Sequence, residues 1–243
     1  MPVLAVALAL ACLPTLLVAA EPPRGEPHPQ PAIVEFRTYR AAADGLDALH
    51  ARLRDVVIPT LARHGVTTQA VLVPAGDNPD RLVFLLTAAA SAEAMEAGWK
   101  GLDAGEATER LVTTAWSPPF TPAVSATPRV FERRTYTCPD PAKHEALLRR
   151  FHDHTLALFA KHGMQNIVYW VPADPPAANH RLVYLLGHAN EAAAKASFAA
   201  FRQDPDWLAA RRASEERAGG SLTTAQKGVV SEFLAATDYS PLR

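Results

Sequence analysis

Two short stretches of the chain place a carboxylate, a guanidinium and a phenol at alternate positions. Alternate residues of a β-strand point to the same side of the sheet, so each stretch would present its three polar groups together. A glutamate and an arginine on one face bind each other or the carboxylate of a ligand, and a neighbouring phenol can orient the bound molecule. This pattern gives our first candidates for a binding site: Glu35, Arg37, Tyr39, Glu132, Arg134 and Tyr136.

Three aromatic residues of the second half, Tyr169, Trp170 and Tyr184, extend this candidate binding set. Each group also has a structural alternative. Buried aromatic residues commonly fill a core. A buried glutamate beside an arginine can be an ion pair that seals the interface between two sheets. The sequence leaves both interpretations open.

Histidine is frequent in the second half of the chain, which raises proton transfer and metal binding as further chemistry. His162 comes one residue before Gly163 at the end of a helical run, where the helix dipole favours a positive charge. If the protein is an enzyme, we expect His162, His154 and Tyr136 to move or orient protons. At a rise of about 1.5 Å per residue, His154 and His162 are about 12 Å apart and cannot chelate one ion, so we predict no metal site.

The composition is that of a folded globular protein, since 49% of the 243 residues are hydrophobic, 20% are charged and the formal net charge is -1. Binding to a phosphate backbone requires a surplus of basic residues, so we predict no nucleic-acid partner. The pairs Arg149-Arg150 and Arg211-Arg212 are interpreted as solvated helix faces. If Cys12 is removed with a leader, Cys138 is the only thiol, and its neighbours predict an ordinary turn cysteine.

The first twenty residues, Met1 to Ala20, are almost wholly apolar and end in small residues, as an export signal does. Residues 21–31 follow as a proline-rich linker that cannot pack into a core. We therefore predict an exported protein, periplasmic or extracellular, with no stable membrane insertion once the signal is cleaved. The alternative is that the apolar run remains as an N-terminal membrane anchor.

The rest of the chain carries the same order of structural signals twice, which predicts a duplication. Each copy begins with an alternating strand and an amphipathic helix that ends at a His-Gly pair, His64-Gly65 or His162-Gly163. Two strands, a second helix and a last strand follow in each copy. The predicted copies are residues 32–122 and 129–243, and the second has an additional helix between Asp204 and Arg217.

This order of elements predicts tandem ferredoxin-like (βαββαβ) domains of the α+β class. Helices would cover one face of each antiparallel sheet and leave the other face open. Two open faces in one chain can bury each other, so we predict an intramolecular dimeric α/β barrel with a pocket between the sheets. With Val34, Phe36 and Phe131 under the helices, the polar triplets would point into that pocket. If side chains fill the space between the sheets, no ligand can bind there.

Several motifs of the second copy resemble the NIPSNAP domain of the dimeric α+β barrel superfamily. They are Arg134-Thr135-Tyr136, His154-Thr155, the run from Phe159 to Met164, Tyr169-Trp170, the run from Leu182 to Leu186, the stretch from Asp204 to Trp207 and the stretch from Thr237 to Pro241. The first copy keeps part of this pattern but has Val71-Leu72 in place of the aromatic pair. The resemblance implies the barrel fold. Related barrels include cofactor-independent monooxygenases, haem-degrading enzymes and ligand binders, so no single reaction follows from it.

Three functional classes fit these features, and a homo-oligomer is compatible with each. The first is an exported barrel that binds a small, partly apolar molecule or a protein partner, without catalysis and without a cofactor. The second is a cofactor-independent or haem-dependent monooxygenase, in which Arg134 would hold an anionic substrate, Tyr136 would orient it and His162 or His154 would move protons. The third is a structural or adaptor module.

Overall fold

The computed structural model describes residues 33–43, 45–127, 129–173 and 180–243. The expected export signal, residues 1–20, and the linker, residues 21–31, lie outside this part of the chain. The description begins with four strands and the helices between them. Their bounds are β1 Ile33–Arg40, α1 Leu46–Arg52, η1 Leu53–Val57, α2 Ile58–Arg63, β2 Thr67–Pro74, β3 Leu82–Ala89, α3 Ala92–Trp99 and β4 Ala107–Thr113.

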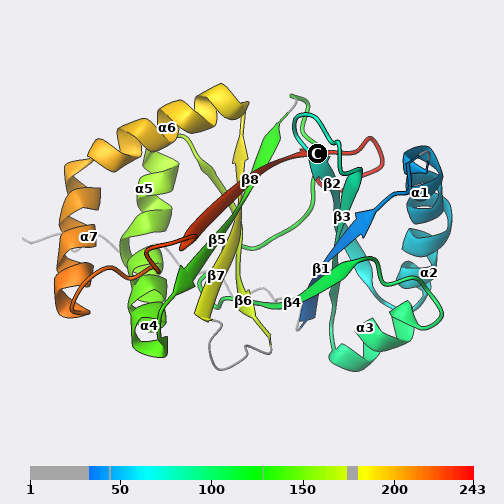
Figure 1. The fold of residues 1–243 in the computed structure, drawn as a ribbon, viewed down its shortest axis with the longest axis horizontal. Coiled ribbons are helices and arrows are strands. Elements are labelled where there is room, and N and C mark those ends of the chain that lie inside the picture. Colours follow the sequence, from blue (N-terminus) through cyan, green and yellow to red (C-terminus); the bar gives the residue numbers. More distant parts are fainter. Residues whose placement is uncertain (1–32, 44, 128, 174–179) are drawn as a thin grey trace, which may run out of the picture.

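The remainder of the chain has the same order of elements with one helix more (Figure 1). Two short segments, η1 and η2, are π-helical turns inside longer helical runs. The bounds of this second part are β5 Val130–Cys138, α4 Pro141–Arg150, η2 Phe151–Thr155, α5 Leu156–Lys161, β6 Gln165–Pro172, β7 His180–His188, α6 Glu191–Gln203, α7 Pro205–Arg217 and β8 Val229–Ala236.

Local sequence explains where several helices begin and end. Asp140 is the N-cap of α4, where its Oδ1 accepts a hydrogen bond from the backbone N–H of Lys143 at 2.8 Å. Ser91 and Asn190 cap α3 and α6 in the same way. Gly163, with a φ of 76°, follows α5 in the left-handed conformation that favours glycine and stops the helix.

The eight strands form one closed antiparallel barrel in the order β1-β3-β2-β8-β5-β7-β6-β4. Two seams join the strands before residue 114 to those after residue 129. At one seam β2 pairs with β8, with Leu72 opposite Ala236, and at the other β4 pairs with β6, with Thr113 opposite Trp170. Helices α1–α3 lie outside the barrel on one side and α4–α7 on the other (Figure 1). The sheet is thus closed on itself and covered by two helical layers.

Apolar side chains from both parts of the chain fill the inside of the barrel. Val34, Phe36, Phe131 and Trp170 belong to one buried cluster, and none of the four is more than 3% exposed. Its members come from strands and connecting segments on both sides of the barrel and none lies in a helix, so the cluster occupies the space between the sheets. The prediction of a ligand pocket in that space is therefore wrong, because large apolar side chains occupy it.

A separate apolar core lies under each helical layer. Leu53 and Trp99 of the helical segments pack with strand residues such as Val83 on one side. Phe151 and Phe198 are buried in the core on the other side. The strands are consequently buried on both faces, by the barrel interior and by helices.

The segments that follow β4 and β8 each cross to the opposite part of the chain. Ser117 Oγ accepts a hydrogen bond from the backbone N–H of Tyr169 at 3.1 Å, and Ser240 Oγ accepts one from the N–H of Val71 at 2.9 Å. The backbone N–H three residues before each serine donates to the carbonyl of the same partner residue, at 3.0 Å in both cases. These two tails therefore attach each part of the chain to a strand of the other.

Candidate functional site

The polar triplet of β1 points toward the helices and away from the barrel interior. Arg37 donates to Glu35 Oε2 from Nε at 2.9 Å and from Nη2 at 2.6 Å, and its guanidinium carbon lies 3.7 Å from the ring centroid of Trp99 in α3. Tyr39 belongs to the core beneath α1–α3. The prediction that this triplet faces a space between the sheets was wrong. Alternation shows which residues share a face, but it does not show which face the helices cover.

The triplet of β5 forms a buried network on the helix side of the sheet. Glu132 lies 2.5 Å from Arg134 Nη1, 2.5 Å from Ser231 Oγ and 3.1 Å from His188 Nε2, and Arg134 Nε donates to the Tyr184 hydroxyl at 3.0 Å. Burial acts to raise the pKa of Glu132, but the His188 hydrogen bond and the Arg134 charge outweigh it, so the pKa lies below its ordinary value. These groups satisfy one another, as in a structural ion pair. A ligand role for them stays a prediction.

The three aromatic binding candidates do not share one environment. Tyr169 and Tyr184 stack under α4–α6 with ring centroids 5.1 Å apart and an interplanar angle of 19°. Trp170 is the next residue along β6 and points to the opposite face, into the barrel interior. All three are buried to 1% exposure or less, so they act as core residues in this structure.

The candidate catalytic residues lie in three separate places. His162 Nε2 is 2.7 Å from Asp204 Oδ2, at the junction of α5 and α7. Tyr136 packs against Phe151 in the core beneath α4. His154 is exposed on η2. Within the described part of the chain, no hydrogen bond, ion pair or aromatic contact joins any two of the three residues, so they do not form a catalytic unit here.

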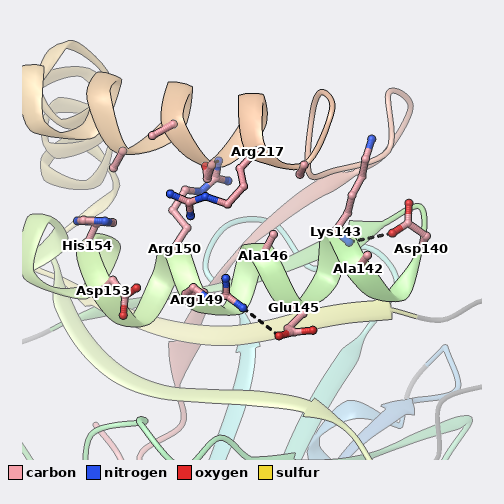
Figure 2. A pocket seen from close by; sticks show the side chains of 14 residues that line it. Asp140, Ala142, Lys143, Glu145, Ala146, Arg149, Arg150, Asp153, His154 and Arg217 are labelled. Carbon is pink, nitrogen blue, oxygen red and sulfur yellow. Dashed lines mark hydrogen bonds and ion pairs between the residues drawn. The ribbon is translucent and has the colours of Figure 1, made fainter.

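A groove between α4 and α7 is the site that best combines volume, charge and an apolar surface (Figure 2). Its cavity volume is about 360 Å³, and small residues of both helices line it, including Ala142, Ala146, Ala210 and Ala213. The first part of the chain has no counterpart of α7 between α3 and β4. The sequence predicted the additional helix but gave no indication that it would create a groove beside α4.

Charged side chains surround this α4–α7 groove. Four are cationic, and three are carboxylates, which leaves an excess of one positive charge when His154 is neutral. Arg149 is paired with Glu145 at 2.9 Å, one turn apart on the exposed face of α4. The cations are Lys143, Arg149, Arg150 and Arg217, and the carboxylates are Asp140, Glu145 and Asp153.

Arg150 is the buried cation of the groove, and its side chain is only 5% exposed. Its Nη1 donates to Ser214 Oγ at 3.3 Å, Glu215 lies 3.7 Å away, and the guanidinium carbon is 5.0 Å from the ring centroid of Trp207. Its Nε is buried without a hydrogen-bond partner among the described residues, and burial lowers the pKa of the side chain. The interpretation of Arg149-Arg150 as a solvated pair is therefore wrong for Arg150, because α7 covers it.

Arg217 approaches Arg150 from the opposite wall of the groove. Figure 2 shows Arg150 rising from α4 and Arg217 reaching down from α7, so that both guanidiniums lie between the helices. Within the described residues, Arg217 forms no ion pair with a carboxylate. Two guanidiniums beside an alanine-lined wall can bind an anion that also carries an apolar group.

Asp204 fixes the start of α7 against the rest of the molecule. Its Oδ1 accepts from the backbone N–H of Asp206 at 2.9 Å, as an N-cap does, and its Oδ2 lies 2.8 Å from Lys161 Nζ and 2.7 Å from His162 Nε2. The hydrogen bonds of Lys161 and His162 hold the pKa of Asp204 below its ordinary range. The position of α7, and with it one wall of the groove, depends on this carboxylate.

Two further observations concern the described residues as a whole. No group of three or more His, Cys, Asp or Glu side chains among them is arranged to hold a metal ion. None of the described helices is long and apolar enough to cross a membrane.

The closed antiparallel barrel with helices on both sides defines the class of this protein, which has the fold of the dimeric α+β barrels. An anthrone oxidase-like protein is similar to it with a TM-score of 0.55 and 13% identity, over 86% of this chain and 93% of that one. A candidate monooxygenase from Fusobacterium nucleatum gives a TM-score of 0.54 and 9% identity, over 85% and 93% of the two chains. At these identities the likeness is one of fold alone.

Within this class, residues 131–241 match the model of the NIPSNAP family, so the second part of the chain contains a NIPSNAP domain. A NIPSNAP family protein from Agrobacterium tumefaciens aligns with 18% identity and a TM-score of 0.41, over 51% of this chain and all of its own. A comparison with curated protein sequences gave no match. The NIPSNAP domain includes both helices of the α4–α7 groove.

Proposed function

We propose that this protein is an exported, non-catalytic binding protein that holds a small, partly apolar molecule in the α4–α7 groove. The observation that carries the proposal is the groove itself, which combines about 360 Å³ of volume, an alanine-lined wall and a buried arginine. A buried charge is expensive unless something compensates for it. Arg150 is only partly compensated, by Ser214 and Glu215.

We further propose that the chain is a tandem of ferredoxin-like units in which only the second has kept a binding site. The same element order in the two parts and the equivalent bonds of Ser117 and Ser240 support this. The additional α7 supports a specialised second unit, because it provides one wall of the groove. The monooxygenase alternative receives no comparable support, since its candidate residues are apart and the barrel interior is filled.

Retention of a ligand tests the binding proposal. The full chain, purified from its native host, should keep a small molecule that native mass spectrometry detects. Ala213→Trp should expel it, because Ala213 is an exposed residue lining the groove and an indole there fills the cavity. Ala209→Trp is the matched control, since Ala209 is also exposed on α7 but does not line the groove.

Three results would contradict the proposal. An empty protein whose melting temperature no small aromatic or aliphatic compound raises would exclude a small-molecule groove. Equal ligand loss in Ala209→Trp and Ala213→Trp would show that the groove is not the site. Empty protein that instead captures a defined partner from an envelope extract would favour an adaptor.

A further inference from the structure

Three features of the groove determine which ligands it can hold: the paired arginines, the net charge and the nature of the wall. Arg150 Nη1 is occupied by Ser214, whereas Nη2 has no hydrogen-bond partner within the described residues. Figure 2 shows the Arg217 side chain extending from α7 into the same groove. Two planar guanidiniums facing one volume offer parallel N–H donors, the arrangement that matches the two oxygens of a carboxylate.

The charge balance sets the charge of the ligand. Four cations against three carboxylates leave a single positive excess around the groove. Glu215, which lies behind Arg150, weakens the positive potential further. A dianion such as a phosphate monoester would bring one uncompensated negative charge close to Glu145 and Asp153, whereas a monoanion would be balanced.

The wall of the groove sets the body of the ligand. Ala146, Ala210 and Ala213 line the same groove as the two arginines, and no Leu, Ile, Val, Phe, Tyr or Trp is among the described residues that line it. A body the size of one ring or a short alkyl chain would bury its apolar surface there, which is favourable in proportion to the area removed from water. A fully polar ligand would gain nothing from this wall.

We propose that the α4–α7 groove selects a small organic monocarboxylate with an apolar body, with Arg150 and Arg217 binding the carboxylate and alanines of α4 and α7 contacting the body. This inference rests on the proposed binding function and specifies the ligand. The proposal includes no covalent step.

Benzoate and benzyl alcohol are suitable probes because they have the same ring but differ in charge. Titration calorimetry on the full chain at low salt should show benzoate binding at least about tenfold more tightly than benzyl alcohol, since a charge-assisted pair exceeds a neutral contact. Phenyl phosphate, a dianion at pH 8, should bind more weakly than benzoate. Added salt should lower the affinity for benzoate, because it screens the charged pair, and leave the affinity for benzyl alcohol unchanged.

Arg217→Met and Arg212→Met form a matched pair, because both arginines are exposed on α7 and only Arg217 lines the groove. Arg217→Met should reduce benzoate affinity about tenfold and leave benzyl alcohol affinity unchanged, while Arg212→Met should change neither. Equal affinity for the two probes, or equal effects of the two variants, would overturn the carboxylate proposal. If Ala213→Trp still removed the retained ligand, the binding function would stand although the ligand class was wrong.

Discussion

At the scale of single residues, Arg150 combines a favourable position for binding with an unfavourable position for folding. Its side chain is only 5% exposed, and its buried Nε has no hydrogen-bond partner among the described residues. Replacing both members of a buried ion pair by apolar residues of similar volume is often neutral or stabilising by about 1–4 kcal/mol, whereas removing one member destabilises the fold when the other charge stays buried without a partner. The carboxylate left behind, Glu215, keeps a partner in Arg211 at 3.1 Å.

We therefore predict that Arg150→Met leaves the free energy of unfolding unchanged or raises it, while benzoate affinity falls about tenfold. Urea denaturation measures the first quantity and calorimetry the second. Arg212→Met, at an exposed position, should change stability by less than about 0.5 kcal/mol and leave binding intact. A loss of stability of several kcal/mol in Arg150→Met would instead mean that the arginine serves the fold.

Cys138 gives a second prediction at this scale. The thiol is buried at the end of β5, and burial raises its pKa to about 12. Only the thiolate reacts with disulfide reagents, so the native thiol should react at least about a hundredfold more slowly at pH 8 than the thiol of the unfolded chain. The Cys12→Ser variant leaves this single thiol to be followed by absorbance. Fast labelling of the native protein would show that β5 opens or that the thiol is activated.

At the scale of elements, Asp204 couples the position of α7 to pH. Its pKa is lowered in the folded state by Lys161 and His162, so the ionised carboxylate stabilises the fold above its unfolded pKa of about 4. That contribution is lost as the pH falls below about 4 toward the lower folded pKa. Protonation would remove the anchor of α7 while the barrel strands keep their hydrogen bonds.

We predict that the protection of α7 amides, relative to their intrinsic exchange rates, falls between pH 4 and pH 3 before that of β5 or β7 does, as measured by hydrogen exchange with mass spectrometry. Asp204→Asn should keep the N-cap and abolish this pH dependence, because the amide still accepts from the N–H of Asp206. Asp204→Ala should loosen α7 at every pH and weaken benzoate binding. Uniform exchange of α7 and the strands in all three proteins would contradict the coupling.

The elements also show how far the sequence could predict this structure. The alternation of β1 and β5, the cap residue Asp140 and the His-Gly helix ends gave the order and nearly the bounds of the elements, because these signals are local. The orientation of β1 could not be predicted, since both of its faces are buried and either could have been the helix side. The groove was missed because it exists only where α7 packs beside α4, and no local pattern in Arg149-Arg150 shows that a helix covers one arginine and leaves the other exposed.

At the scale of the whole molecule, the barrel interior is an apolar core to which both parts of the chain contribute, and not a ligand cavity. Phe36 and Phe131, which come from different parts of the chain, fill it together. Glu109 of β4 also forms ion pairs with Arg133 and Arg181 of the second part, the latter at 2.7 Å. Neither part could bury its inner sheet face alone, so we expect the described region to unfold as a single cooperative unit.

The crossing tails make this cooperativity testable. Ser117 and Ser240 each accept a hydrogen bond from a backbone N–H of the opposite part, and both serines are buried, at 7% and 0% exposure. Replacing either serine by alanine leaves the N–H of Tyr169 or Val71 buried without an acceptor, which costs about 1–3 kcal/mol. We predict that Ser117→Ala and Ser240→Ala each lower the free energy of unfolding by this amount.

The unfolding transition should stay single in both variants, because the barrel core still joins the two parts. Tyr and Trp fluorescence and far-ultraviolet circular dichroism, followed in the same urea titration, should give coincident curves. Ser221→Ala is the matched control, since Ser221 is exposed and bonds only within its own loop, to Thr223. If Ser240→Ala produced two separate transitions, the tails and not the shared core would hold the halves together, and the groove in the second half could then fold independently of the first.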